Sequence, residues 1–452
     1  MIRRTGAYPL AERISENSRR SSNFDALANY SITAYALPLN DRFSIRAMPT
    51  MRPGEPSAEL SEGERRDKLG KRLGEVKRAS AMRVILIATI AAAAHGQLKK
   101  HPPKGVGDGG PAIKAQLNAP SGVAVGDGYL YIYESFGEAI RRVDLAKGMI
   151  STVARGCDPP VQNPPPNGCF GPLTELQINS GGKLLLSEFT YDRLSSLDPR
   201  SLHLSTIAGY TTLPLNRSGL PAPLTKYSGP HCSTTDDKGN IFICDAGYYI
   251  RRIDGQTGAI SIVAGSGKRG FAGDHGPAIA AELGLPISIV VNRAGDIFIS
   301  DDTSNRIRRV DGSGIIETIA GSGPISQGSI GYLGFGGEGG PATEARLAQP
   351  RALAFDQDEN LLFVVNTRVC RIDRATGALS TIAGNGQDGF SGDGGPATKA
   401  RIGPDALAVD RQGNLFIAEF ENNRVRRVDA KTGIITTVAG NGLPHRPPPV
   451  FY

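Results

Sequence analysis

The chain of 452 residues contains 57 Gly and 31 Pro but no Trp, and its net charge is +7. Short apolar runs separated by Gly and Pro favour short strands and turns over long helices. The positive charge is concentrated in residues 1–81, with 15 Lys and Arg against 10 Asp and Glu; the remaining residues hold 36 against 34. The basic folded face of a nucleic-acid-binding protein is therefore not expected.

Two N-terminal segments precede the repetitive part of the chain. Residues 1–81 show no clear period, so we expect a disordered extension or an over-extended start of translation. In residues 82–97, Met82 and Arg83 precede an apolar core at residues 84–94, which is the layout of a secretory signal and is too short to span a bilayer. This segment predicts a secreted or periplasmic protein without a transmembrane span. A buried apolar segment behind a disordered tail is the alternative.

The segment GFSGDGGPATKARI, at residues 389–402, is one of several Gly-rich copies in the chain. A Gly-rich turn before a helical turn can bind phosphate, but a single phosphate loop does not recur six times. We therefore interpret the copies, two of them degraded, as structural connectors. The prolines that mark them are 49 to 64 residues apart: Pro111, Pro172, Pro221, Pro277, Pro341 and Pro396.

The last repeat unit shows how the residues between connectors fold. Short apolar stretches at residues 405–410, 415–419, 424–429 and 434–440 alternate with short loops, which predicts a four-stranded antiparallel meander. An aspartate ends the third strand of every unit: Asp144, Asp198, Asp254, Asp311, Asp373 and Asp429. One such sheet cannot bury both faces, but six arranged radially can pack on their neighbours. The expected fold is all-β, a six-bladed β-propeller over residues 104–443 with a Pro-rich tail at residues 444–452.

The units resemble the NHL repeat, in which a GVAVD-like strand and an LFIAD-like strand precede NRIRRVD and TGIITVAG. The likeness is strongest at residues 245–265, 301–321 and 419–440, and the GDGGPA connector is similar to that of secreted bacterial NHL proteins and of the teneurin propeller. The second unit departs from the pattern with YDRLSSLD, and the fifth with NTRVCRID. Some six-bladed relatives are lyases or lactonases with a metal in the channel, and tripartite-motif relatives bind RNA through a basic face.

The second strand of each unit ends in a polar residue on the face where the connectors emerge: Glu134, Glu188, Asp245, Asp301, Asn366 and Glu419. Clustered carboxylates suit a hard cation or a polyamine, so one interpretation is a ligand site at the channel mouth. The other interpretation is that each side chain caps its own turn by accepting backbone N–H hydrogen bonds. Recurrence once per blade favours this second, structural role.

Paired arginines occupy four third strands, at residues 141–142, 251–252, 308–309 and 426–427. Strand alternation sends one member of each pair to each sheet face, where a guanidinium can meet a carboxylate; a phosphate-binding ring is the alternative. We expect no catalytic residue and no cofactor, because the histidines show no metal-ligand spacing and no Ser or Cys has an evident His partner. The six histidines are His95, His101, His203, His231, His275 and His445.

Five cysteines include two closely spaced pairs. Cys157 and Cys169 flank a Pro-rich loop, and Cys232 and Cys244 flank a segment that, if it forms a hairpin, sets them opposite each other. Two short-range disulfides suit an oxidising compartment, with Cys370 left over. The alternative is that all five are reduced and packed.

A long connector at residues 321–337 carries the apolar side chains Tyr332, Leu333 and Phe335. They either pack on the neighbouring blade or contact a partner. We therefore expect a monomeric, non-catalytic scaffold that binds a protein or glycan, but not nucleic acid, through its connector face. The alternative is a lyase or hydrolase with a divalent cation at the channel mouth.

Overall fold

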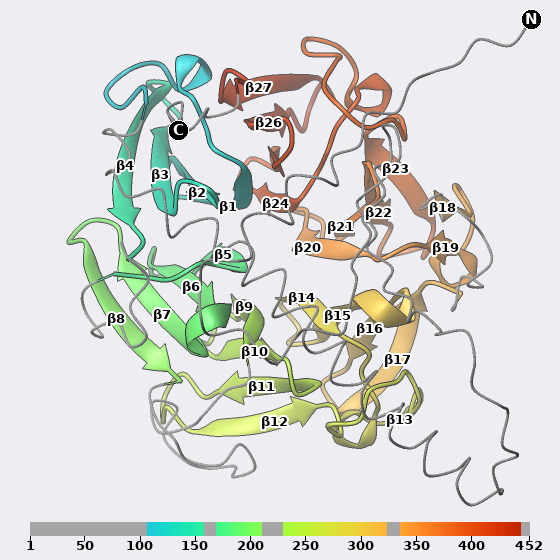
Figure 1. The fold of residues 1–452 in the computed structure, drawn as a ribbon. Helices are drawn as coiled ribbons and strands as arrows, with labels where there is room; N and C mark the ends of the chain where they lie inside the picture. The colour runs from blue at the N-terminus through green and yellow to red at the C-terminus, as the bar shows by residue number, and fades with distance from the viewer. Residues whose placement is uncertain (1–105, 158–168, 210–228, 323–334, 444–452) are drawn as a thin grey trace, which may run out of the picture. The chain divides into compact units, whose positions relative to one another are not determined.

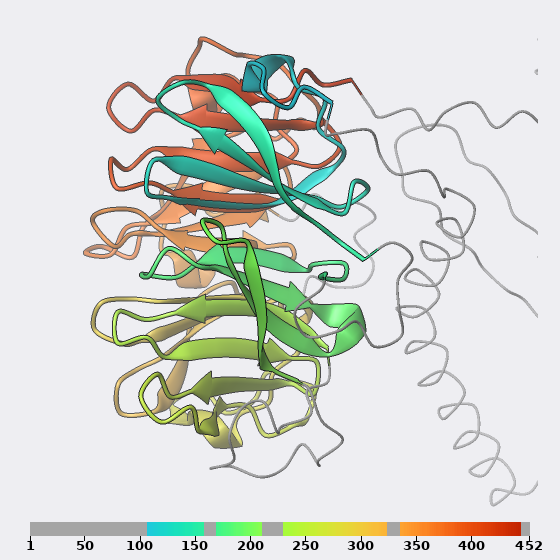
Figure 2. The same ribbon diagram turned by 90° about the vertical axis from the view of Figure 1, so that its left-hand side faces the viewer.

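The computed structural model describes residues 106–157, 169–209, 229–322 and 335–443. Six antiparallel sheets are arranged around a central axis (Figure 1), which confirms the predicted six-bladed β-propeller. In the view at right angles, the strands run from one face of the propeller to the other (Figure 2). The N-terminal extension, the signal-like segment, Tyr332, Leu333 and the tail at residues 444–452 lie outside the described residues.

Each of the first three blades uses four consecutive strands, numbered outwards from the axis. Blade 1 contains β1 (Pro120–Gly126), β2 (Tyr129–Glu134), β3 (Ala139–Asp144) and β4 (Met149–Arg155). Blade 2 contains β5 (Glu175–Ile178), β6 (Leu184–Glu188), β7 (Arg193–Asp198) and β8 (His203–Ala208). Blade 3 contains β9 (Pro230–Thr235), β10 (Ile241–Asp245), β11 (Tyr249–Ile253) and β12 (Ile260–Ala264).

The last three blades follow the same plan, with two short additions in their connectors. Blade 4 contains β14 (Pro286–Val291), β15 (Ile297–Asp301), β16 (Arg306–Val310) and β17 (Ile315–Ala320), with β13 (Gly276–Pro277) added at its outer edge. Blade 5 contains β20 (Arg351–Phe355), β21 (Leu361–Val365), β22 (Arg368–Ile372) and β23 (Leu379–Ala383), preceded by the pair β18 (Phe335–Gly336) and β19 (Arg346–Leu347). Blade 6 contains β24 (Ala406–Val409), β25 (Leu415–Glu419), β26 (Arg424–Val428) and β27 (Ile435–Ala439).

Helical structure in the described residues is limited to single 3₁₀ turns. Four follow the connector prolines: η2 (Ala112–Lys114), η5 (Ala278–Ala280), η7 (Ala342–Glu344) and η8 (Ala397–Lys399). Two others lie between second and third strands: η3 (Phe189–Tyr191) and η6 (Asp302–Ser304). None of the helices in the described ranges has the length and apolar character that crossing a bilayer requires.

The hydrophobic core lies between neighbouring blades. For example, Leu130 and Ile132 of β2 share one buried cluster with Phe416 and Ala418 of β25. Each sheet is buried on both sides because the blades pack face to face around the ring. This explains why the second strands read as nearly continuous apolar runs.

Each well-formed connector joins two blades by backbone hydrogen bonds. Gly265, which follows β12, donates its N–H to the carbonyl of Ala278 at 2.9 Å, and Ala278 donates to the carbonyl of Gly314 in blade 4 at 2.8 Å. Gly273 has φ +103°, and a Cβ there would lie 2.8 Å from the Cα of Ala281. The connector therefore needs glycine at this position both for its conformation and for space.

The same joint closes the ring. Gly440, which follows β27, donates its N–H to Ala112 at 3.0 Å, and Asn441 donates to Ala115 at 2.9 Å. The N-terminal connector copy thus holds the last blade against the first, and among the described strands none is exchanged between these blades. The sequence alone did not reveal this closure.

Both predicted disulfides are present. Cys157 and Cys169 are joined across the connector that follows β4, and Cys232 and Cys244 are joined across the paired strands β9 and β10. Cys370 is a buried free thiol in β22.

Candidate functional site

The residues that end the second strands lie inside the wall of the propeller. Five are buried, Glu134, Glu188, Asp245, Asp301 and Glu419, and one, Asn366, is half-buried. Four contact a third-strand guanidinium: Glu134 with Arg141 at 3.3 Å, Glu188 with Arg193 at 2.6 Å, Asp245 with Arg251 at 2.6 Å and Glu419 with Arg426 at 3.6 Å. Their oxygens therefore already have cationic partners within the wall.

Some of these carboxylates also hold the chain where it enters a blade, whereas Asp245 accepts the N–H of Gly247 in the turn that follows it. Asp301 accepts the N–H groups of Gly284 and Leu285 at 2.8 Å each, and Glu134 accepts that of Asn118 at 3.0 Å. These donors precede the first strand of the same blade. The carboxylates thus tie the connector to the second strand.

The acidic residue of the connector also contacts the buried arginines. Asp108 lies 2.8 Å from Arg141, Asp274 lies 2.6 Å from Arg308, and Asp393 lies 2.7 Å from Arg426. All three guanidinium side chains are at most 1% exposed. This arrangement confirms that the first arginine of these pairs is buried against a carboxylate.

Blade 5 lacks two of the three parts of this charge arrangement and keeps an acidic connector residue. Asn366 stands where the other blades have a carboxylate, Cys370 stands at the buried arginine position, and the connector residue is Glu338. Glu338 accepts the N–H of Thr381 at 2.6 Å and its hydroxyl at 2.7 Å. In blade 5 the arginine and the second-strand carboxylate are thus absent together, whereas blade 2 has Ser195 at the arginine position and pairs Glu188 with Arg193 instead.

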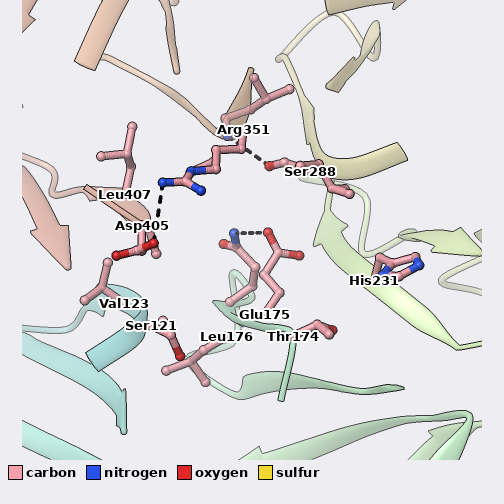
Figure 3. Close-up of a pocket in the computed structure, with 16 residues that line it drawn as sticks. Ser121, Val123, Thr174, Glu175, Leu176, His231, Ser288, Arg351, Asp405 and Leu407 are labelled. Carbon is pink, nitrogen blue, oxygen red and sulfur yellow. Dashed lines mark hydrogen bonds and ion pairs between the residues drawn. The ribbon is translucent and has the colours of Figure 1, made fainter. Parts of the chain in front are cut away.

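A cavity of about 270 Å³ lies at the centre of the ring, where the six first strands begin (Figure 3). The register places it beside the connector face, because Pro120, Pro230 and Pro286 pair with the residues that end the second strands. One equivalent position per blade lines the cavity, following a proline in five of the six blades: Ser121, Thr174, His231, Ile287, Arg351 and Asp405. We call this cavity the mouth.

Two carboxylates in the mouth have different surroundings. Glu175 of β5 accepts the N–H of Ser233 at 2.5 Å and the amide of Gln177 at 3.3 Å, and burial raises its pKa to about 8. Asp405 lies 3.5 Å from Arg351; burial raises its pKa, and the guanidinium partly opposes this rise.

His231 and Arg351 complete the charged groups of the mouth. The ring of His231 lies 4.9 Å from that of Phe189, and burial lowers the pKa of the imidazole. Arg351 donates to the carbonyl of Pro404 at 2.9 Å in addition to its contact with Asp405. In Figure 3, Arg351 and Glu175 reach into the mouth from opposite sides.

Comparisons with known proteins agree with this architecture. The family described as "SMP-30/Gluconolactonase/LRE-like region" matches residues 289–442. Mouse (Mus musculus) teneurin-1 is 30% identical over 200 residues, and bovine (Bos taurus) NHL repeat-containing protein 2 is 23% identical over 340 residues. The chain is a six-bladed β-propeller whose sequence is similar to NHL-repeat and SMP-30/gluconolactonase-like proteins.

The extent of these matches is limited. The match to teneurin-1 covers 40% of this chain and 7% of teneurin-1, and the match to NHL repeat-containing protein 2 covers 72% of this chain and 40% of that protein. A solved structure of a Bacteroides thetaiotaomicron protein of unknown function shares the fold with a TM-score of 0.52 and 16% identity, over 72% of each chain. That likeness concerns the fold alone.

Most residues of the mouth were not predicted from the sequence. The predicted sites consisted of residues that recur in every blade, whereas the position after the first-strand proline carries a different side chain in each. The usable signal was this variation at a fixed place in the repeat. Of the histidines in the described residues, His231 lies in the mouth, and His203 and His275 are exposed elsewhere. The described residues hold no group of three or more His, Cys, Asp or Glu arranged to bind a metal.

Phe335, the described member of the predicted partner-contact residues, lies in β18 and is half-buried. It packs against the core cluster of blades 4 and 5, and its ring lies 5.2 Å from the guanidinium of Arg368. Packing on the neighbouring blade, one of the two roles expected of it, is thus present.

Proposed function

We propose that the protein is a secreted or periplasmic, non-catalytic propeller that binds a glycan or a protein segment on its connector face, with the mouth as its binding site. The observation that carries this proposal is that six blades contribute six different side chains to one cavity. A residue needed for blade geometry recurs in each repeat, whereas an asymmetric ligand requires different groups around it. The second-strand carboxylates are not part of this proposed site, because each already lies against a guanidinium or accepts backbone N–H groups.

An aromatic pair beside the mouth supports a glycan as the partner. Phe136, in the loop after β2, is 59% exposed, and its ring lies 5.3 Å from that of Phe420, in the loop after β25. Phe420 also donates its backbone N–H to Asp405 at 3.0 Å, which links the pair to the mouth. Exposed aromatic faces beside convergent polar groups suit a sugar ring. The two disulfides support export, because they persist in oxidising compartments.

The test is a binding screen with the 452-residue chain and libraries of glycans and peptides. Ile287→Trp fills the mouth, while Ile279→Trp makes the same change at a side chain of η5 that is 60% exposed. Ligands of the wild-type protein should be lost with Ile287→Trp and kept with Ile279→Trp. Ligands that bind all three proteins equally would place the site elsewhere.

A second candidate is a lyase or hydrolase that uses a divalent cation at the mouth. The observation that favours it is the family match at residues 289–442. Glu175, His231 and Asp405 line the mouth and are of types that bind such cations, although the described residues hold no group of three arranged as metal ligands. Elemental analysis and calorimetric titration with Ca²⁺ separate the candidates. A stoichiometric metal that is lost in Asp405→Asn would favour the enzyme, and no heat of binding would favour the scaffold.

A further inference from the structure

We propose that the mouth recognises a primary ammonium group on its ligand, and that Glu175 is the carboxylate that receives it. This inference rests on the proposed function, because it assigns a chemical class to the ligand of the same cavity. It concerns a residue that the repeat pattern does not explain.

Glu175, which is half-buried, differs from the buried second-strand carboxylates in its partners. Glu134, Glu188, Asp245 and Glu419 each lie within 3.6 Å of a guanidinium nitrogen. Within the described ranges, Glu175 makes no ion pair, and its two oxygens each accept one hydrogen bond from a neutral donor. A carboxylate oxygen has room for a further hydrogen bond, so both oxygens can still accept one from a ligand.

The other titratable groups of the mouth do not neutralise the negative charge of an ionised Glu175. The titratable groups of the other elements that line the cavity are His231, which precedes Cys232 in β9, Arg351 of β20 and Asp405 just before β24; β1 and β14 contribute none. Arg351 enters from the opposite side and is already paired with Asp405 (Figure 3). Burial lowers the pKa of His231, so its ring is neutral at pH 7.

The size of the mouth restricts the ligand to a small group. A cavity of about 270 Å³ is at or below the lower end of the usual range for small-molecule pockets. It suits an amino sugar or the end of a lysine side chain, both of which present the same ammonium. Ser121 and Thr174 also line the mouth, with their hydroxyl groups hydrogen-bonded to Ser135 and to the carbonyls of Ser187 and Pro230.

Binding of an ammonium should release a proton. Because burial raises the pKa of Glu175 to about 8, its carboxyl group is mostly protonated in the free protein at pH 7. A cation beside it favours the ionised form, so complex formation should release roughly 0.9 proton per ligand. A neutral ligand in the same cavity has no such effect.

The experiment titrates the 452-residue chain at pH 7 in phosphate and in HEPES, two buffers without primary amines. One arm compares glucosamine with glucose, and the other compares Nα-acetyl-lysine methylamide with its Nε-acetylated form. We expect the amine of at least one pair to bind roughly tenfold more tightly than its neutral counterpart. Its heat should differ between the buffers by the amount expected for about one released proton. The arm that responds identifies the source of the ammonium.

Glu175→Gln keeps an acceptor for the N–H of Ser233 and removes the charge. It should abolish the preference for the amine and the proton release, whereas Glu344→Gln, at an exposed position of η7, should leave both intact. Thermal unfolding of both variants verifies that they are folded. The inference is overturned if amine and neutral ligand bind equally, or if the mouth binds another ligand but neither amine. If no ligand at all is blocked by Ile287→Trp, the proposed function itself fails.

Discussion

The guanidinium of Arg308, which is fully buried in β16, lies 2.6 Å from Oδ1 of Asp274, which belongs to the connector 34 positions earlier in the chain. Asp274 also accepts the hydroxyl of Thr318 in β17 at 2.6 Å. The connector is therefore attached to both outer strands of the blade that follows it. The Gly-rich copies are thus joints between blades.

Removal of Asp274 should destabilise the propeller because it leaves the charge of Arg308 buried without its partner. We expect Asp274→Ala to lower the free energy of unfolding by on the order of 3 kcal/mol. Asp237→Ala, in an exposed turn of blade 3, is the control and should change it by less than about 0.5 kcal/mol. Urea unfolding measures both values. Equal stability of the two variants would show that the buried pair is dispensable.

A matched pair of glycines tests the steric requirement of the connector. Gly273 and Gly295 both have positive φ, at +103° and +92°, but a Cβ on Gly295 would have nothing within 4 Å. Alanine should cost roughly 1 kcal/mol at Gly295 for conformation alone. It should cost more at Gly273, where it meets the backbone of Ala281. Thermal unfolding of Gly273→Ala and Gly295→Ala gives the difference, and equal melting temperatures would argue against a crowded joint.

Counting the free thiols tests the two disulfides directly. Of the five cysteines, two pairs are bonded and Cys370 is free. Burial raises the pKa of the Cys370 thiol to about 12, so the reactive thiolate is scarce at neutral pH. A thiol reagent should detect no thiol in the native protein, one after denaturation and five after reduction. Five thiols without reductant would mean that the native chain is reduced.

The carboxyl group of Glu175 should make the free energy of unfolding decrease as the pH rises. Burial raises its folded pKa to about 8, above the ordinary value of 4.5, so the folded state binds the proton more tightly than the unfolded chain. Its contribution is complete below pH 4.5 and is lost as the pH rises to 8. Stability of the wild-type protein relative to Glu175→Gln should therefore fall across this window.

Glu419 also contributes to the pH dependence of the free energy of unfolding. Burial raises its pKa to about 7, so its contribution likewise decreases as the pH rises. Comparison of each protein at pH 5 and pH 8 by thermal unfolding isolates the contribution of Glu175. Glu344→Gln should keep the slope of the wild-type protein. A slope that Glu175→Gln leaves unchanged would show that the folded carboxyl group titrates normally.

Much of the architecture could be predicted because it repeats. The third-strand aspartates, the paired arginines and the marker prolines recur with the blade, and a recurring residue reports a requirement of local geometry. The cysteine pairs were also predictable, since Cys232 and Cys244 needed only a hairpin between them to become neighbours. The burial of the second-strand residues was harder to predict, because whether Glu134 faces a solvent channel or Arg141 depends on how neighbouring blades pack.

The sequence by itself determined the blade period, the four-strand plan and the two disulfides, because these depend on contacts within one repeat or between adjacent strands. Only the tertiary structure decided how the ring closes and which side chains meet at its centre. Ala112 and Gly440 are brought together by the curvature accumulated over six blades. Glu175, Arg351 and Asp405 likewise share one cavity because closure brings together first strands that are far apart in the chain.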